Sequence, residues 1–162
     1  MILGFLAGMV YASLLAVAVI SDVATLRIPN WISVLLVAAF VAAALLAAKP
    51  VDWFSHLAAG SIVLLVGMAL FAWGKLGGGD AKLLAAVSLW HGLPLLPALV
   101  LAIGIAGGIL ALACLALRRM DVGTLLEARG WRAASLARGM GIPYAVAIAA
   151  GCALLAPKLF LF

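Results

Sequence analysis

Short polar interruptions divide this chain into a series of apolar stretches. An α-helix needs about 20 apolar residues to cross the hydrocarbon core of a bilayer. The stretches are Ile2–Ile20, Trp31–Ala48, Trp53–Trp73, Ala81–Trp90, Leu95–Leu117 and Ile142–Leu161. The pattern predicts an all-α integral membrane protein. Its single domain, residues 1–162, is expected to be a bundle of six transmembrane helices.

The division between the fourth and fifth stretches rests on a short break, because residues 81–117 are apolar almost throughout. A single helix over this range would be roughly 55 Å long, almost twice the thickness of the hydrocarbon core. Gly92 and Pro94 interrupt the range and disfavour a continuous helix. Two helices joined by a tight turn are therefore expected.

Composition supports the membrane assignment. Hydrophobic residues make up 69% of the 162 residues and charged residues only 9%, and mean hydropathy is +1.38. These values exclude a water-soluble globular domain. The first stretch has no basic residues ahead of it and is followed by further apolar stretches, so it is interpreted as a retained span rather than a secretory signal.

Small residues within the apolar stretches are expected to serve packing. Two pairs of glycines, Gly4 with Gly8 and Gly104 with Gly108, have the four-residue spacing that lets membrane helices approach closely. Cys114 and Cys152 lack the paired spacing of a zinc site or the density of a disulfide framework. We expect both cysteines to be free thiols.

Basic residues are distributed unevenly between the connections. With six crossings, the first, third and fifth connections share one side of the membrane. They hold Arg27, Lys75, Lys82, Arg118, Arg119, Arg129, Arg132 and Arg138. The other side holds only Lys49 and Lys158. This imbalance predicts that the basic side faces the cytoplasm and that both termini lie on the other side, in the periplasm. The net charge of +5 thus reflects topology, and no nucleic-acid partner is expected.

Of the five acidic residues, two stand out by position. Asp52 precedes a span and is expected to cap it, while Asp121 and Glu127 lie in the long basic connection and are expected to be solvated. Asp22 follows the first apolar stretch and Asp80 precedes the fourth. The two crossings between them return the chain to the same face, so these carboxylates are predicted to meet at one membrane boundary.

Two interpretations of this pair remain open from topology alone. An ionisable group at the edge of hydrocarbon is a functional candidate by default. Asp80 at a helix start could instead cap that helix and complement its dipole. Asp22 is at a helix end, where negative charge is unfavourable, so capping does not explain it. A functional pair and two unrelated boundary carboxylates are equally supported at this point.

Three glycines precede the second aspartate, in Gly77-Gly78-Gly79-Asp80. Without Cβ atoms they let another helix or an extended peptide lie close to the carboxylate, although loop flexibility alone would also use glycine. Two close carboxylates suit water-mediated peptide hydrolysis, because repulsion keeps both from ionising and they share a proton. One can then activate a water while the other donates to the scissile carbonyl.

Three local motifs resemble a known family. Asp22 is followed by Arg27-Ile28-Pro29-Asn30, residues 77–83 read GGGDAKL, and Gly141-Ile142-Pro143-Tyr144 is a weaker match. Together they resemble the type IV prepilin peptidases, which are GxGD-type intramembrane aspartyl proteases. The resemblance implies that Asp22 and Asp80 are the catalytic pair, that no cofactor is needed, and that the leader of a prepilin or pseudopilin is cut at the cytoplasmic membrane boundary.

One feature of the longer family members does not appear in the sequence. Those members carry a zinc-binding domain with paired cysteines near the N-terminus, associated with N-methylation of the trimmed pilin. No paired cysteines precede Asp22 here. The chain is similar to the short members that serve Tad/Flp-type pilus systems, so methylation by this polypeptide is not expected.

Further polar residues carry less specific signals. Gly77, Gly78, Gly79, Asn30 and Lys82 are candidates for positioning substrate. Asn30 could equally cap the second helix, and Lys82 could extend toward lipid headgroups.

Other polar features are assigned to structure or lipid. His56 and His91 fall on the outer side, away from the aspartates, where packing is expected and no metal site is supported. The arginine-rich segment 118–138 is expected to lie on the cytoplasmic lipid surface.

Two other classes of function compete with the protease. In a small ion-coupled transporter or channel component the two carboxylates would form a proton relay. Such a relay is expected near the bilayer midplane, whereas both aspartates lie at one edge. In a purely structural subunit of a pilus apparatus the aspartates would be dispensable.

Overall fold

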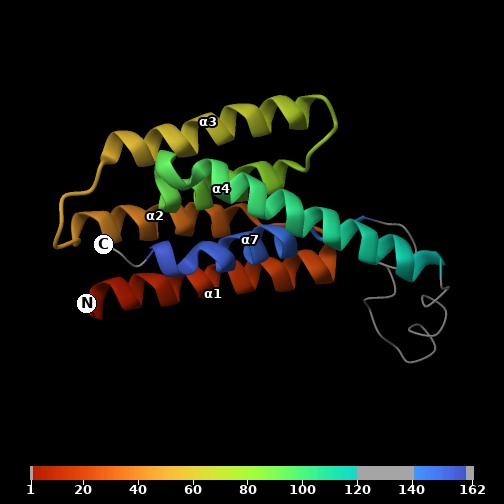
Figure 1. The fold of residues 1–162 in the computed structure, drawn as a ribbon, viewed down its shortest axis with the longest axis horizontal. Helices are drawn as coiled ribbons and strands as arrows, with labels where there is room; N and C mark the ends of the chain where they lie inside the picture. Colours follow the sequence, from red (N-terminus) through yellow and green to blue (C-terminus); the bar gives the residue numbers. More distant parts are fainter. Residues whose placement is uncertain (1, 120–140, 160–162) are drawn as a thin grey trace.

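The computed structural model describes residues 2–119 and 141–159. Its helices, shown in Figure 1, are α1 (Ile2–Thr25), α2 (Asn30–Leu45), α3 (Trp53–Ala72), α4 (Gly78–Arg119) and α7 (Tyr144–Leu159). No strand occurs in these two ranges. The expected all-α fold is therefore confirmed for the described part of the chain.

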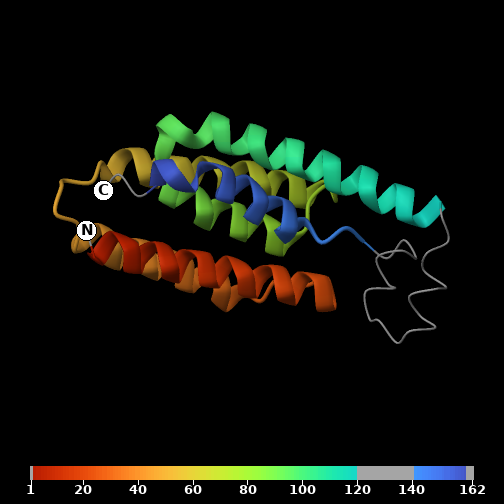
Figure 2. The same ribbon diagram turned by 60° about the horizontal axis from the view of Figure 1, so that its bottom comes forward.

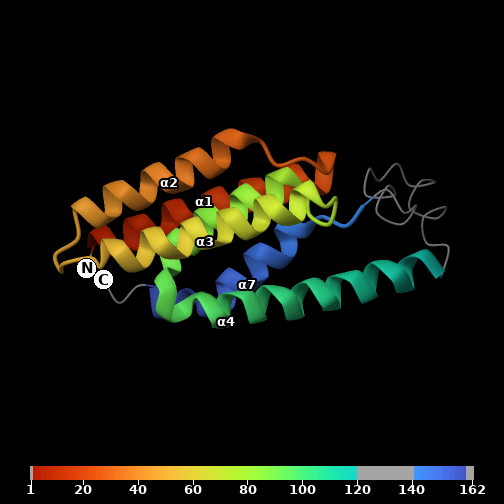
Figure 3. The same ribbon diagram turned by 90° about the horizontal axis from the view of Figure 1, so that it is seen from above.

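The helices run along the long axis of the molecule, and the chain reverses direction at each connection (Figures 1 and 3). It also reverses within α4, where Gly92 has the non-helical angles φ 66° and ψ 177°. Glycine adopts this conformation readily because it has no Cβ. The predicted break between the fourth and fifth stretches is thus confirmed, and it divides α4 into a first half (residues 78–91) and a second half (residues 93–119).

Side chains at the start of α3 form hydrogen bonds that stabilise the chain reversal in α4. The backbone N–H of Leu93 donates to Ser55 Oγ at 3.0 Å. Ser55 N–H donates to Asp52 Oδ1 at 3.1 Å, which confirms the capping role predicted for Asp52. Pro94 follows directly, and proline is tolerated in the first turn of a helix because no partner is needed for an N–H there. The second half of α4 therefore begins as a newly capped helix.

The outward faces of the helices are apolar. Three described segments are long and apolar enough to cross a membrane, Gly4–Thr25, Trp53–Ala72 and Gly78–Leu117, while α2 and α7 are shorter apolar helices. Large hydrophobic side chains such as Phe54 and Leu154 are 78% and 71% exposed. Apolar surface of this extent suits contact with lipid rather than water.

Helix α1 is longer than expected. It was predicted to end at Ile20 but continues through Asp22 to Thr25. The Thr25 hydroxyl donates to the carbonyl of Ser21 at 2.8 Å, so this polar last turn satisfies its own hydrogen-bonding groups. Asp22 is therefore within the last turn of α1, at the helix end where the sequence placed it.

The core joins α1, α2, both halves of α4 and α7. Its most buried large side chains are Ile32, Leu36, Leu83, Leu99 and Ile148. The view in Figure 2 shows α1 and α2 side by side, with α7 facing them and α4 beyond. This packing carries the ends of α1 and α2 to the start of α4.

An aromatic cluster fills the bundle at the end where α3 begins and α4 breaks. The Tyr11 and Trp90 ring centroids are 4.9 Å apart, and Phe40 is 5.9 Å from Trp90. His56 and His91 are buried within this cluster, with Nδ1 atoms 2.6 Å from the Leu89 carbonyl oxygen and 2.8 Å from the Val87 carbonyl oxygen.

The two histidines therefore pack at the end of the bundle opposite the aspartates, as the sequence predicted.

The close approach of α7 to α4 does not depend on the glycines that were expected to provide such contacts. A Cβ added at Gly104 or Gly108 would meet no atom within 4 Å in the described part of the chain. At Gly151 of α7, in contrast, it would lie 2.8 Å from the backbone nitrogen of Ile103. The expectation for Gly104 and Gly108 is wrong because a four-residue spacing places two glycines on one face without deciding which face meets a partner.

We expect Gly151→Ala to destabilise the protein, because the added methyl group would press on the backbone of α4. Overpacking of this kind costs about 1–3 kcal/mol. The matched control is Gly104→Ala, which has open space and gains helix propensity worth up to about 1 kcal/mol. The midpoint of thermal unfolding in detergent should fall for the first variant only. Equal midpoints would contradict the close approach of α7 to α4.

Candidate active site

Asp22 is buried, with 5% of its surface exposed. Its Oδ2 accepts a hydrogen bond of 2.9 Å from the backbone N–H of Ala145, the second residue of α7. N–H groups in the first turn of a helix have no partner within that helix, and the helix dipole favours negative charge there. Asp22 therefore caps α7. The sequence argument that capping does not explain Asp22 considered only its own helix, and it is wrong for this reason.

Asp80 is the third residue of α4, and its carboxylate accepts a hydrogen bond from the backbone N–H of Gly77. This is half of a capping box, in which a side chain in the first turn reaches back to the residue before the helix. Asp80 nevertheless remains half-exposed and faces a pocket. Capping and a place in the pocket are therefore compatible, although the sequence presented them as alternatives.

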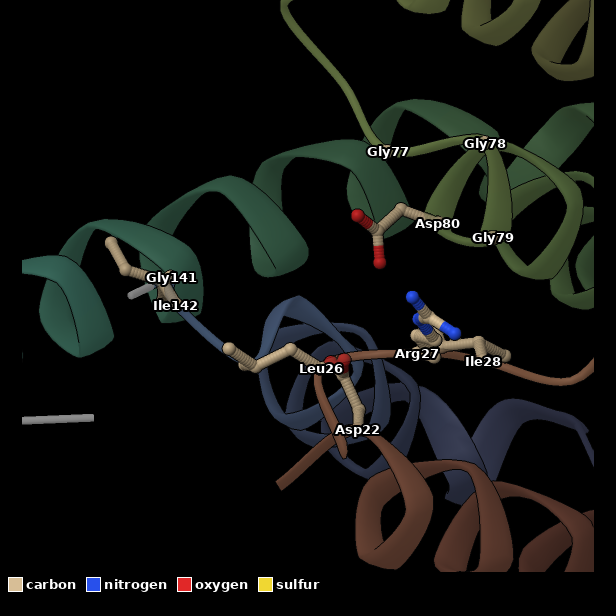
Figure 4. Close-up of a pocket in the computed structure, with 10 residues that line it drawn as sticks. All are labelled: Asp22, Leu26, Arg27, Ile28, Gly77, Gly78, Gly79, Asp80, Gly141 and Ile142. Carbon is tan, nitrogen blue, oxygen red and sulfur yellow. The ribbon is translucent and has the colours of Figure 1, made fainter. Parts of the chain in front are cut away.

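Both aspartates line one pocket of about 430 Å³. Figure 4 shows the Asp80 carboxylate projecting into it from α4, with Asp22 on the opposite wall at the end of α1. The lining residues are Asp22, Leu26, Arg27, Ile28, Gly77, Gly78, Gly79, Asp80, Gly141 and Ile142. Three segments far apart in the sequence thus meet here, including the Gly141–Tyr144 motif that gave only a weak sequence signal.

The three glycines before Asp80 have different surroundings. A Cβ at Gly77 would lie 2.6 Å from Asp80 Oδ2. At Gly79 it would lie 3.1 Å from the Cβ and 3.4 Å from the carbonyl oxygen of Ile28, whereas at Gly78 it would meet only the ring of Phe71, at 3.3 Å. All three glycines line the pocket, but a methyl group at the first would press on the Asp80 carboxylate and one at the third on Ile28, whereas the nearest atoms to one at the second belong to a side chain that can move.

Hydrogen bonds hold the connection between α1 and α2 in place. Leu26 has the left-handed φ of 53°, and its N–H donates to the carbonyl of Asp22 at 2.8 Å. The Ser21 and Thr25 hydroxyls donate to the carbonyl of Arg27, at 2.9 and 3.4 Å. A left-handed leucine costs of order 1–3 kcal/mol and persists only where its surroundings enforce it. The backbone that enters the pocket is thus rigidly positioned.

Asn30 and Lys82 contact each other. Lys82 Nζ donates to Asn30 Oδ1 at 2.9 Å. Asn30 is the first residue of α2, and no side-chain hydrogen bond caps that helix, so the capping alternative for Asn30 is wrong. Neither residue lines the pocket. Their bond ties the start of α2 to the start of α4, two residues along the chain from the pocket residues Ile28 and Asp80.

Other candidate residues lie elsewhere. The described residues contain no group of three or more His, Cys, Asp or Glu side chains that could hold a metal ion. Cys114 and Cys152 are free and buried, as predicted. Most of the arginine-rich segment, residues 120–138, lies outside the described residues, as do Asp121 and Glu127. The chemistry that the pocket offers is therefore that of two carboxylates.

Comparisons with known proteins agree with the geometry. A profile of the type IV leader peptidase family matches residues 9–112, a range that includes Asp22 and Asp80. A "Prepilin leader peptidase/N-methyltransferase" of Bacillus subtilis (strain 168) is 30% identical over 146 residues, which cover 89% of this chain and 52% of the relative. The chain thus spans about half the length of that relative. No solved structure matches.

Proposed function

Because the chain belongs to the type IV leader peptidase family, we propose that it is an intramembrane aspartyl endopeptidase that removes the leader peptide of a prepilin or pseudopilin. The observation that carries this proposal is the pocket that Asp22 of α1 and Asp80 of α4 line from opposite sides, with the glycine box, Gly77–Gly79, beside Asp80. Among the residues that line the pocket, these two aspartates are the ones that can act as general acid and general base.

The proposed mechanism uses the two carboxylates as one unit. They hold one shared proton, because repulsion disfavours ionisation of both. One carboxylate takes a proton from water as the water oxygen bonds to the scissile carbonyl carbon. The other carboxyl group donates a proton to the carbonyl oxygen. The intermediate then collapses, the C–N bond breaks and the leaving amine takes a proton. Titration belongs to the pair, so neither aspartate has a fixed role.

We place the site at the cytoplasmic boundary of the bacterial inner membrane, with six crossings and both termini in the periplasm. The alternating direction of the helices supports an even number of crossings (Figure 3). Arg27 and Lys75 lie in the connections at the aspartate end, and Lys82 lies near the start of α4 at the same end. The positive-inside rule assigns that end to the cytoplasm. The apolar helix of the substrate would then stay in lipid while its leader enters the pocket.

The proposed substrate is a prepilin of the Tad/Flp type, because the chain resembles the peptidases of those pilus systems. The two aspartates lie at one end of the bundle. This position, together with the family match, favours peptidase activity over a proton relay across the membrane.

The proposed topology predicts where reporters are active. Reporter fusions made after Lys75 should be active in the cytoplasm, and fusions after Lys49 should be active in the periplasm, because an odd number of crossings separates the two positions. Paired phosphatase and fluorescent-protein fusions measure this. If the Lys75 fusion reports the periplasm and the Lys49 fusion the cytoplasm, the proposed orientation is reversed. If both fusions report the same side, α3 does not cross the membrane.

The experiment that tests the activity is reconstitution of the purified chain in lipid nanodiscs with a purified prepilin. We expect a shorter product whose new N-terminus, identified by mass spectrometry, lies at the junction of leader and apolar helix. Cleavage should continue in EDTA, because the proposed chemistry uses no metal. Failure to cut any prepilin, or cleavage that stops in EDTA and returns with added metal, would contradict the proposal.

A further inference from the structure

Arg27 is the only cation among the described residues that line the pocket. Figure 4 shows its guanidinium and the carboxylate of Asp80 turned toward each other across the pocket. The structure gives this guanidinium no ion pair with any residue that it describes. The Arg27 side chain is exposed, so its donors are open to a molecule that enters the pocket.

The backbone that carries this side chain is fixed on both sides. Ser21 and Thr25 hold the Arg27 carbonyl, as described above. On the other side, Ile28 packs against Gly79, whose missing Cβ leaves room for it. The guanidinium therefore projects from a rigid base, and its five N–H donors remain available.

A rigidly based, unpaired donor beside two carboxylates has a specific use in peptide hydrolysis. Negative charge develops on the scissile carbonyl oxygen as water attacks, and donors that point to that oxygen lower the barrier more than they strengthen substrate binding. The carboxylates themselves are hydrogen-bond acceptors when ionised, so the pair supplies a single proton for this oxygen. Arg27 is placed to supply further donors.

We propose that Arg27 hydrogen-bonds the carbonyl oxygen of the scissile peptide and stabilises the tetrahedral intermediate, an inference that rests on the proposed peptidase function. As the water oxygen bonds to the carbonyl carbon, the π electron pair moves to the carbonyl oxygen. That oxygen receives a proton from the acidic aspartate and a hydrogen bond from Arg27. Arg27 keeps all its protons, and water supplies the atoms that are added to the two products.

The test compares Arg27→Gln and Arg27→Lys in the nanodisc assay, with Lys75→Gln as a control cation at the same end of the bundle that does not line the pocket. Loss of one oxyanion donor typically lowers kcat by about 10²–10³-fold. We expect a fall of that order for Arg27→Gln with little change in KM. Arg27→Lys should be faster than Arg27→Gln but slower than the parent, because lysine keeps the positive charge but lacks the planar set of N–H donors of the guanidinium. Lys75→Gln should match the parent.

Three results would overturn the inference. A parent-like kcat in Arg27→Gln would show that the guanidinium serves another purpose, such as binding lipid headgroups. A raised KM at unchanged kcat would make it a substrate-binding residue. A lower unfolding temperature in both variants, with no recovery in Arg27→Lys, would assign it to folding. If the parent fails to cleave, or if Asp80→Asn still cleaves, the proposed function itself fails instead.

Discussion

Asp22→Asn and Asp80→Asn should each abolish cleavage of a prepilin while the variant proteins remain folded. An asparagine side-chain oxygen can still accept the hydrogen bonds from Ala145 and Gly77, so each helix start keeps its cap. The change removes only the ionisable proton. A capping role alone would cost at most about 1 kcal/mol of stability. A general acid and base acting as one unit should instead lose roughly 10⁴-fold or more in rate.

The double variant sharpens this prediction. Because each carboxylate is needed for the same proton transfers, removing both should cost little more than removing either. Asp52→Asn is the matched control, because Asp52 caps α3 at the other end of the bundle. This variant should cleave the prepilin at the parental rate. The readout is a gel shift of co-expressed prepilin, normalised to membrane levels by immunoblot. Near-parental trimming by either single variant at normal level would refute the assignment of the pair.

The glycine box provides the second large effect. Gly77→Ala should lower kcat by about 10²-fold, because its Cβ would lie 2.6 Å from Asp80 Oδ2 and the carboxylate would have to move. Displacements of the order of 1 Å in a catalytic group can cost this much. Gly79→Ala should lower the rate less, since its Cβ presses on Ile28, which lines the same pocket.

Gly78→Ala is the internal control for this series. Its Cβ would meet only the exposed ring of Phe71, which can rotate away, and none of the three glycines has a left-handed φ that alanine would resist. Initial rates and unfolding midpoints of the three variants should be measured together. If Gly78→Ala were the most damaging of the three, the close approach around Asp80 described here would be incorrect.

Much of this arrangement could be predicted because it depends on periodic or local signals. Apolar runs predicted the helices, and Gly92 with Pro94 predicted the break in α4. The antiparallel order of the helices then placed Asp22 and Asp80 at the same end. These inferences need only helix length and the direction of each crossing.

The contacts that complete the pocket could not be predicted in this way. Asp22 finds its hydrogen-bond donor at Ala145, which is 123 residues further along the chain, and Lys82 finds Asn30 at a separation of 52. Such pairs depend on how the helices rotate and pack, and a single sequence does not specify this. The same holds for Gly151, whose approach to α4 replaced the contact expected from Gly104 and Gly108.

The hydrogen bond from Ala145 to Asp22 also bears on biosynthesis. It joins α1 to α7, the first and the last of the described helices, so one wall of the pocket is absent until α7 has entered the bundle. A ribosome-bound chain that has inserted only α1 to α4 already contains both aspartates, but Asp22 lacks the amide that fixes its carboxylate. The proposed catalytic pair is therefore fully assembled only after α7 has packed against the other helices.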